Sequence, residues 1–166
     1  MAIKDVVQNP DPVLHKKAEP IKDFKDENLD SLIEDMKDTV VEQDGAGLAA
    51  PQIGVSKAVF VIPKEYAPKV RIPKKPHSLL RPVKQEVFIN PRILKYGEEK
   101  QKIEEGCLSI KGVYHPTTRS YKATIEAQDE NGRKFRVKGE GLLARIFQHE
   151  TDHLNGMLFI DRLHEK

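Results

Sequence analysis

The pattern with the clearest chemistry in this sequence is His149-Glu150-Thr151-Asp152-His153. On a helix, histidines at i and i+4 lie one above the other on a single face, so both imidazoles can reach one metal ion. Glu150 lies about 100° further round such a helix. Its carboxylate could therefore act on a water molecule at the same site without being a ligand. Catalytic sites of this type normally have three protein ligands and one open position.

The sequence after His153 offers no third ligand. Gly156 matches the extended pattern HExxHxxGxxH, but Phe159 occupies the position of its last histidine. Only 13 residues follow His153 in a chain of 166, so a later ligand has little room. The single cysteine, Cys107, follows Gly106, which would let the backbone approach closely. A lone cysteine is more often a small buried side chain, but the incomplete metal pattern favours Cys107 as the third ligand.

A chance match on a surface helix is the alternative explanation for the HExxH pattern. Random shuffling of this composition produces it roughly 0.02 times per chain. The flanking residues of 141–154 are apolar on more than one side of a helix, which predicts burial. A buried glutamate is costly without a partner and is stabilised beside a divalent cation.

Composition excludes several classes of protein. The chain has 28 Lys and Arg against 26 Asp and Glu, a formal charge of +2, so we expect no DNA partner. One cysteine excludes an internal disulfide and a four-cysteine zinc site. No apolar run approaches the roughly 20 residues of a membrane span, and the N-terminus lacks a signal peptide pattern. We expect a cytoplasmic protein without membrane contact, and leave open a trimmed organellar form.

The periodicity of the chain predicts an α+β fold. Apolar residues from Leu29 to Val40 recur at helical spacing after a plausible N-cap, Asp26, and Gly45 is a natural stop. Residues 57–62 and 87–90 are typical of short buried strands. Residues 121–138 alternate apolar and polar around the turn Asp129–Gly132, which predicts a hairpin. We expect antiparallel β-sheets packed around the central helix of 141–154, with a second, amphipathic helix near the N-terminus.

Two segments lack regular periodicity. Residues 45–54, GAGLAAPQIG, are rich in Gly and broken by Pro. They form either a simple turn or a surface against which a peptide backbone can lie as an added strand. Residues 63–84 hold five of the eleven prolines, seven basic residues and one acid, Glu65. We expect a single catalytic domain, 1–166, with 63–84 as an exposed basic, Pro-rich insertion.

Three motifs in order resemble the signatures of the peptide deformylases: GAGLAAPQ (45–52), EGCLS (105–109) and HETDH (149–153). The match extends to NPDPVLHKKAEPI near the start and to the segment after HETDH, and so covers nearly the whole chain. The resemblance implies a hydrolase that removes the N-formyl group from the N-terminal formyl-methionine of newly made polypeptides and releases formate. Its substrates would be N-formylmethionyl peptides.

The resemblance also implies a role for each motif residue. Glu150 would act first as general base and then as general acid. The ion would usually be Fe²⁺, with Zn²⁺, Ni²⁺ or Co²⁺ able to replace it. The metal ligands would be Cys107, His149 and His153; Gln52 and the backbone N–H of Leu108 would stabilise the oxyanion; and Ala46, Gly47 and Gly106 would line the substrate site. Ala46 stands where the family commonly has a bulkier aliphatic residue, which affects the shape of the methionine pocket.

Other interpretations stay open at this point. An HExxH endopeptidase is disfavoured by the missing downstream ligand. A binding module with a purely structural ion would need a fourth ligand, and it leaves Gln52 and Glu150 unexplained. Arg119 suits either substrate carbonyls or an ion pair with Glu105. The basic residues of 63–84 suggest transient contact with ribosomal RNA, against the commoner alternative of a solvated loop.

Overall fold

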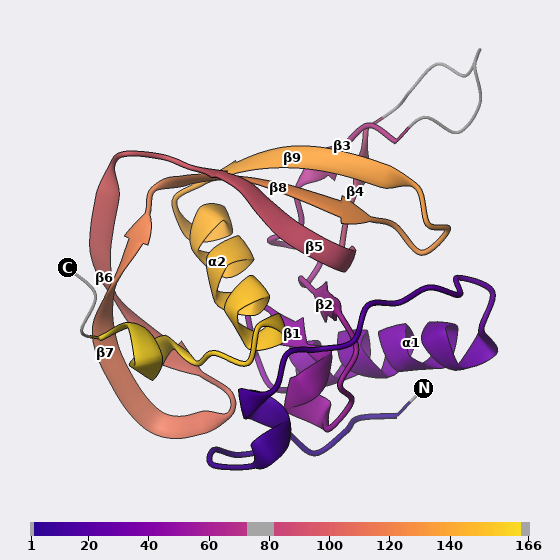
Figure 1. Ribbon diagram of the computed structural model, residues 1–166, viewed down its shortest axis with the longest axis horizontal. Helices are drawn as coiled ribbons and strands as arrows, with labels where there is room; N and C mark the ends of the chain where they lie inside the picture. Colours follow the sequence, from indigo (N-terminus) through magenta and orange to yellow (C-terminus); the bar gives the residue numbers. More distant parts are fainter. Residues whose placement is uncertain (1, 73–81, 164–166) are drawn as a thin grey trace.

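The computed structural model describes residues 2–72 and 82–163, whose arrangement Figure 1 shows. These residues form three antiparallel sheets, two α-helices and three short 3-10 turns. In chain order the elements are η1 (Pro12–His15), α1 (Glu27–Glu42), β1 (Leu48–Ala49), η2 (Ala50–Ile53), β2 (Val59–Val61), β3 (Lys69–Val70), β4 (Val83–Lys84), β5 (Val87–Tyr96), β6 (Lys100–Cys107), β7 (Ile110–Ser120), β8 (Lys122–Gln128), β9 (Lys134–Glu140), α2 (Leu142–Leu154) and η3 (Phe159–Arg162).

The sheets surround α2. The largest has the order β1-β2-β5-β8-β9, and the strand pairs β3-β4 and β6-β7 form separate two-stranded sheets. Figure 1 shows α2 in the middle, with the long strands β5, β8 and β9 on one side and the curved β6-β7 hairpin on another. The expected α+β fold, with antiparallel sheets around a central helix, is confirmed.

The amphipathic helix α1 is also confirmed. Asp26 is its N-cap, and the Asp26 carboxylate accepts the N–H of Asn28 at 2.9 Å. Its apolar stripe packs against β1 and β2 in a buried cluster. The helix ends at Glu42, three residues before the glycine that the sequence suggested as its stop. The buried apolar residues of the stripe are Leu29, Ile33, Met36 and Val40.

The central helix is held by close packing on its apolar side. Phe147 is fully buried, and its ring lies 5.4 Å from that of Phe88 on β5. A Cβ at Gly139 would lie 2.8 Å from Phe147 Cε2, so glycine at this position lets β9 approach α2. Gly141 has φ +58 and begins the helix as its N-cap. This packing fixes the face of α2 on which the two histidines project.

Two segments differ from the sequence expectation. Residues 45–54 contain a short strand, β1, and a 3-10 turn, η2, because Leu48 and Ala49 pair with Val61 and Phe60 of β2. The hairpin β6-β7 was not predicted at all. Its apolar residues do not alternate, and its buried positions are mostly polar, because they face the site described below.

The segment 63–84 is described except for residues 73–81. Ala67, Val70 and Ile72 are buried against the core, while Lys64, Lys69, Arg71 and Lys84 are exposed. Strands β3 and β4 therefore form a ribbon that is anchored by apolar residues and carries basic ones outward.

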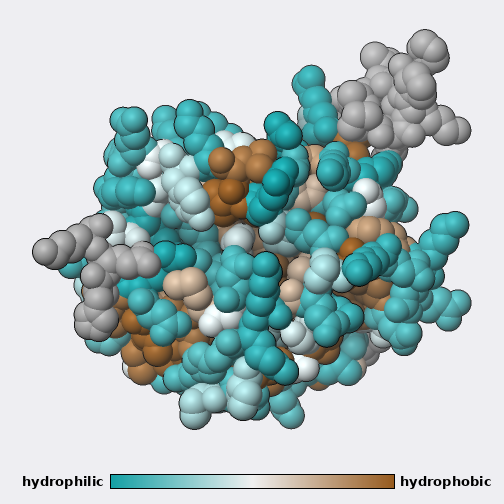
Figure 2. Space-filling view, in the orientation of Figure 1, coloured by the Kyte–Doolittle hydropathy of each residue, from teal (hydrophilic) through white to brown (hydrophobic). Residues whose placement is uncertain are grey.

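The distribution of residues on the surface is consistent with an apolar core enclosed by the sheets and helices. Figure 2 shows one face covered mostly by hydrophilic residues, with hydrophobic residues in separate patches. Within residues 2–72 and 82–163, no helix has the length and apolar character needed to cross a membrane.

Candidate active site

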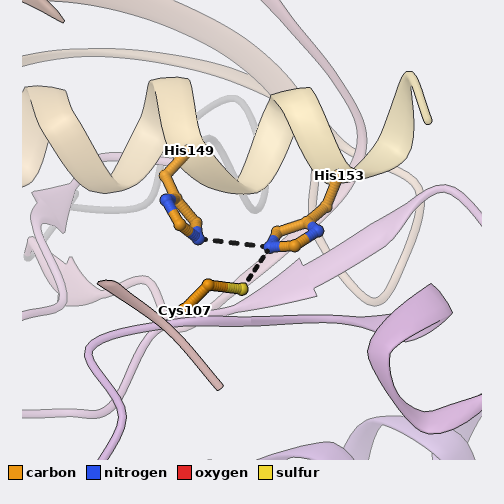
Figure 3. A group of neighbouring side chains, drawn as sticks. All are labelled: Cys107, His149 and His153. Carbon is orange, nitrogen blue, oxygen red and sulfur yellow. Dashed lines mark hydrogen bonds between the residues drawn. The ribbon is translucent and has the colours of Figure 1, made fainter. Parts of the chain in front are cut away.

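Three side chains of the kinds that can bind a metal ion converge between α2 and the end of β6 (Figure 3). The Nε2 atoms of His149 and His153 lie 3.1 Å apart, and Sγ of Cys107 lies 3.3 Å from Nε2 of His153. All three donor atoms lie within 4.8 Å of one another. The helical spacing of the two histidines places their rings side by side, and the sulfur reaches them from the neighbouring strand.

Cys107 stands where β6 ends. The β6-β7 register shifts between Glu105 and Cys107, and Cys107 pairs with Ile110 across a tight turn. This irregularity redirects the cysteine toward α2. Its sulfur lies 3.4 Å from the backbone nitrogen of Ser109 and 3.5 Å from Nε2 of Gln52. Two N–H donors are therefore directed at the sulfur and hold it in place at the end of β6.

The proton on His149 is placed by Glu105. Nδ1 of His149 lies 2.5 Å from Oε1 of Glu105. Burial tends to raise the pKa of Glu105, but hydrogen bonds from His149 and Arg119 outweigh it and hold the pKa far below the usual range. An ionised carboxylate only accepts, so Nδ1 of His149 donates. The other nitrogen, Nε2, faces Cys107 and His153.

The two histidines have opposite pKa shifts. Burial tends to lower the pKa of His149, but hydrogen bonds to Cys107 and Glu105 raise it well above its ordinary value. Burial, reinforced by the charge of His149, lowers the pKa of His153 well below its ordinary value. The Nε2 atoms of the two rings lie 3.1 Å apart, and Sγ of Cys107 lies 3.3 Å from Nε2 of His153, so two ring nitrogens and a sulfur converge on one position.

These donors fit a divalent metal ion. One thiolate and two imidazoles suit ions of borderline softness such as iron, zinc, nickel or cobalt, whereas Mg²⁺ and Ca²⁺ prefer oxygen. Among the described residues, Nδ1 of His153 is buried without a hydrogen-bond partner, and no fourth side-chain ligand joins the three. The donor set therefore has the form of an open site.

Glu150 points into the same space. It is 4% exposed, and burial raises its pKa to about 7. Its Oε2 atom has no hydrogen-bond partner among the residues that the structure describes. A Cβ on Gly47 would lie 2.6 Å from Oε1 of Glu150, so only glycine leaves room for the carboxylate at this position. A carboxyl group with a pKa near 7 is suited both to accept and to return a proton at neutral pH.

Gln52 is fixed with its amide group toward Cys107. Its Oε1 accepts the backbone N–H of Ala49 at 2.9 Å, which identifies the oxygen end of the amide. The NH₂ end then lies 3.5 Å from Cys107 Sγ and 3.3 Å from Ser109 Oγ. The NH₂ group of Gln52, a hydrogen-bond donor, is therefore held next to the converging side chains of Cys107, His149 and His153.

These groups open into one cavity of about 340 Å³. Of the nine site residues that the sequence singled out, eight line this cavity. The ninth, His153, contacts His149 through its Nε2 atom. A larger cavity of about 650 Å³ lies beside the start of α1, but it contains no residue of the three motifs. The lining residues of the smaller cavity are Gly45, Ala46, Gly47, Gln52, Glu104, Glu105, Gly106, Cys107, Leu108, Tyr114, Leu142, Arg145, Ile146, His149 and Glu150.

A buried network of charges supports the site, and most of it was missed from sequence. Arg119 donates to Glu105 at 2.7 Å and to Asp152 at 2.6 Å. Arg145 also donates to Glu105, at 2.8 Å. The open question about Arg119 is therefore decided in favour of the ion pair. The available signal in the sequence was that two acids, Glu105 and Asp152, lie inside the motifs that contain the candidate metal ligands.

Comparisons with known proteins identify the family. A sequence model of polypeptide deformylase matches residues 3–166. The chain belongs to the polypeptide deformylase family. It is 42% identical to the peptide deformylase of Acidobacterium capsulatum over 98% of this chain and 88% of that protein. The crystal structure of peptide deformylase from Thermotoga maritima superposes with a TM-score of 0.81 at 39% identity, over 98% of each chain. The chain is also 40% identical to peptide deformylase 1B, chloroplastic, of Oryza sativa subsp. japonica, over 95% of this chain and 54% of that protein.

As a polypeptide deformylase, the protein is a hydrolase that removes the N-formyl group from new polypeptides and releases formate. The family is metal-dependent, and the cluster of Cys107, His149 and His153 is a possible metal site. Membership disfavours both an endopeptidase and a binding module with a structural ion.

Proposed function

We propose that the cavity described above is the deformylase site, with Cys107, His149 and His153 as metal ligands and Glu150 as the proton-transfer group. The observation that carries the assignment is the convergence of two Nε2 atoms and one Sγ beside a buried carboxyl. An ion held there supplies Lewis acidity, which acidifies water and polarises the formyl carbonyl. We further propose Fe²⁺ as the physiological ion, with Zn²⁺, Ni²⁺ or Co²⁺ able to replace it, since sulfur and imidazole accept all four.

Glu150 moves the proton in this scheme. Its carboxylate takes the proton that water loses on attacking the formyl carbon, and then returns it to the amine nitrogen of the leaving peptide. The pKa near 7 that burial gives Glu150 supports both steps. The same carboxyl therefore serves as base and then as acid, and needs no second acid in the cavity.

Gln52 and Leu108 stabilise the charge that builds on the formyl oxygen. The amide NH₂ of Gln52 is held beside Cys107, and Leu108, which follows Cys107, also lines the cavity. A positioned donor of this type contributes about 3–4 kcal/mol to transition-state stabilisation. The N-formylmethionyl peptide lies against Ala46, Gly47 and Gly106, because a methyl group and two residues without a side chain allow close approach of its backbone.

One experiment tests the assignment. The chain is purified without oxygen, its metal content is measured, and formate release is assayed with a formyl-Met tripeptide beside cleavage of an internal peptide bond. We expect one divalent ion per chain, formate release and no internal cleavage. Glu150→Gln should lower kcat about 10²–10⁴-fold with metal retained. Formate release that survives in Glu150→Gln would reject the proton-transfer role.

We propose that the protein acts in the cytoplasm, as a single catalytic domain spanning 1–166. New polypeptides are made there, and an oxidisable thiolate ligand such as Cys107 is best kept in a reducing compartment. A trimmed organellar form would also lie in a compartment where new polypeptides are made and thiols are kept reduced. The similarity to a chloroplastic peptide deformylase keeps that alternative open.

The basic ribbon formed by β3 and β4 supports a transient contact with the ribosome. Lys69 and Lys84 lie directly opposite each other across the two strands, and both are exposed. Like charges in this arrangement destabilise a strand pair. Lys64 and Arg71, also exposed, add to the same positive surface. An anionic partner such as ribosomal RNA would offset this repulsion.

A double substitution, Lys69→Ser with Lys84→Ser, tests the contact. Co-sedimentation with ribosomes across a salt series should weaken, with a shallower dependence on salt. Lys16→Ser with Lys17→Ser removes the same charge from exposed positions on the N-terminal segment and serves as control. Equal binding by both double variants would reject the contact, and formate release from a tripeptide should be unchanged in both.

A further inference from the structure

The C-terminal turn η3 places an aromatic ring against a metal-binding histidine. Phe159 is 1% exposed, and its ring centroid lies 6.3 Å from that of His149 with the planes 22° apart. This is an offset stacked arrangement. Phe159 also stands at the position that holds the last histidine in HExxHxxGxxH. The chain thus returns to the metal-binding face at that position, but it brings an apolar ring instead of a ligand.

The same turn reaches His149 by a second route. Arg162 donates from Nε and from NH2 to the two oxygens of Asp152, each at 2.6 Å. Asp152 also accepts from Arg119, which in turn donates to Glu105. Glu105 accepts from His149. A continuous chain of hydrogen-bonded charges therefore connects η3 to the imidazole.

The turn itself is firmly held. The backbone N–H of Leu158 donates to Oδ2 of Asp161 at 2.8 Å, and Leu158 is fully buried. The turn packs against both β6 and β7, the strands that carry Cys107 and Arg119. The turn is therefore packed on the strand that carries Cys107, the third candidate ligand.

A stacked ring provides a restraint that the hydrogen bond to Glu105 lacks. The hydrogen bond to Glu105 holds Nδ1, but concerted rotation about χ1 and χ2 of His149 can still tilt the plane of the imidazole. Such rotation would swing Nε2 of His149 away from Cys107 and His153. Contact with the face of Phe159 removes this freedom, because a rotated imidazole would collide with the buried ring.

We propose that Phe159 is a positioning residue that fixes the plane of the His149 imidazole, with Arg162 supporting the same ring through Asp152, Arg119 and Glu105. The inference rests on the proposed assignment of His149 as a metal ligand. It assigns the C-terminal turn a part in metal binding, although the turn supplies no ligand.

The test compares Phe159→Leu with Phe135→Leu in the full chain loaded with Co²⁺. Phe135 is 4% exposed and packs on Phe88 at 5.4 Å, so it is also a buried phenylalanine, but it lies outside the lining of the cavity. Co²⁺ is withdrawn with a competing chelator, and the visible spectrum of the bound ion is recorded. Loss of an outer contact to a metal ligand typically weakens metal binding by about 10-fold or more. We expect that change, with an altered spectrum, in Phe159→Leu alone.

A second pair of variants tests the charged route without touching the core. Arg162→Met should weaken Co²⁺ binding by a few-fold, because Asp152 then loses one of its two arginines. Arg92→Met removes a surface arginine that pairs with Glu126, and should leave Co²⁺ binding unchanged. Chemical denaturation of all four variants gives the loss of stability against which the metal data are compared.

The outcomes separate this inference from the assignment of the ligand. Equal Co²⁺ affinity and equal spectra in Phe159→Leu and Phe135→Leu would overturn the role of Phe159, whether both match the wild type or both are weakened. His149→Ala serves as the reference. If His149→Ala bound Co²⁺ as tightly as the wild type, the ligand assignment would fail, and the inference would fail with it.

Discussion

The carboxylate of Glu105 and the imidazole of His149 form a buried pair in which Nδ1 donates to Oε1 at 2.5 Å. The pair fixes which nitrogen of His149 faces Glu105 and which faces His153 and the cysteine sulfur. Glu105 also accepts from Arg119 and Arg145, so the carboxylate that orients the histidine balances two buried guanidinium groups. Orientation of the ligand and stability of the core therefore depend on one side chain.

Glu105→Gln should impair both properties. Two buried arginines lose their shared negative partner, and breaking a buried ion pair in this way costs about 3–5 kcal/mol of unfolding free energy. Metal affinity should fall about 10-fold, because an amide orients the imidazole less strongly than a carboxylate. Denaturant unfolding and metal competition measure the two effects. Glu126→Gln is the control, since Glu126 also pairs with two arginines, Arg92 and Arg136, but both arginines are exposed and Glu126 does not line the cavity. Equal losses in both variants would contradict the prediction.

Gly47→Ala should lower kcat with the metal still bound. The new Cβ would overlap Oε1 and Cδ of Glu150, at 2.6 and 2.9 Å, and the buried carboxyl would have to move away from its position. A displacement of this kind costs about 10²-fold in rate. Formate release and metal content measure the outcome. Gly139→Ala creates a similar overlap with Phe147, at 2.8 Å, and should lose stability but keep kcat. A normal kcat in Gly47→Ala would show that Glu150 is not held where we place it.

Gly106→Ala should raise KM more than it changes kcat. Its Cβ would lie 2.6 Å from the ring of Tyr114, a 63% exposed residue that also lines the cavity, so the ring would have to shift where we expect the substrate to bind. A loss of about 1 kcal/mol in substrate binding corresponds to a rise of about 5-fold in KM. The double variant with Tyr114→Ala removes the obstruction and should restore KM toward the wild-type value. A change confined to kcat would contradict the prediction.

Gly156→Ala should destabilise the whole fold. Gly156 has φ +74, and a Cβ there would lie 2.8 Å from the carbonyl carbon of His15, which is backbone and cannot move aside. The left-handed conformation alone costs about 1–2 kcal/mol for a residue with a side chain, and the overlap adds to it. Gly112→Ala is the control, because it has the same φ of +74 but nothing within 4 Å of its Cβ. Thermal unfolding should show a larger decrease in Tm for Gly156→Ala than for Gly112→Ala. Equal decreases in Tm would show that the backbone near His15 shifts and relieves the overlap.

Most of the regular elements could be predicted because their apolar residues recur with a clear period. The helix after Asp26 and the hairpin of β8 and β9 are of this kind. The β6-β7 hairpin could not be predicted, since its buried residues include Glu105, Thr117 and Arg119, which look like surface residues in a sequence. They are buried because they bind one another and α2, and such pairing is invisible until the strands are placed.

The sequence by itself determined the chemistry of the candidate site. The histidine spacing, the missing downstream ligand and the lone Cys107 together indicate a three-ligand metal centre, because ligand type and helical periodicity are local properties. Only the tertiary structure decided which nitrogen of each histidine faces the sulfur, why Gly47 has no side chain beside Glu150, and that Phe159 lies against His149. These relationships join residues from different elements, and they exist only once packing has brought α2, β6 and η3 together.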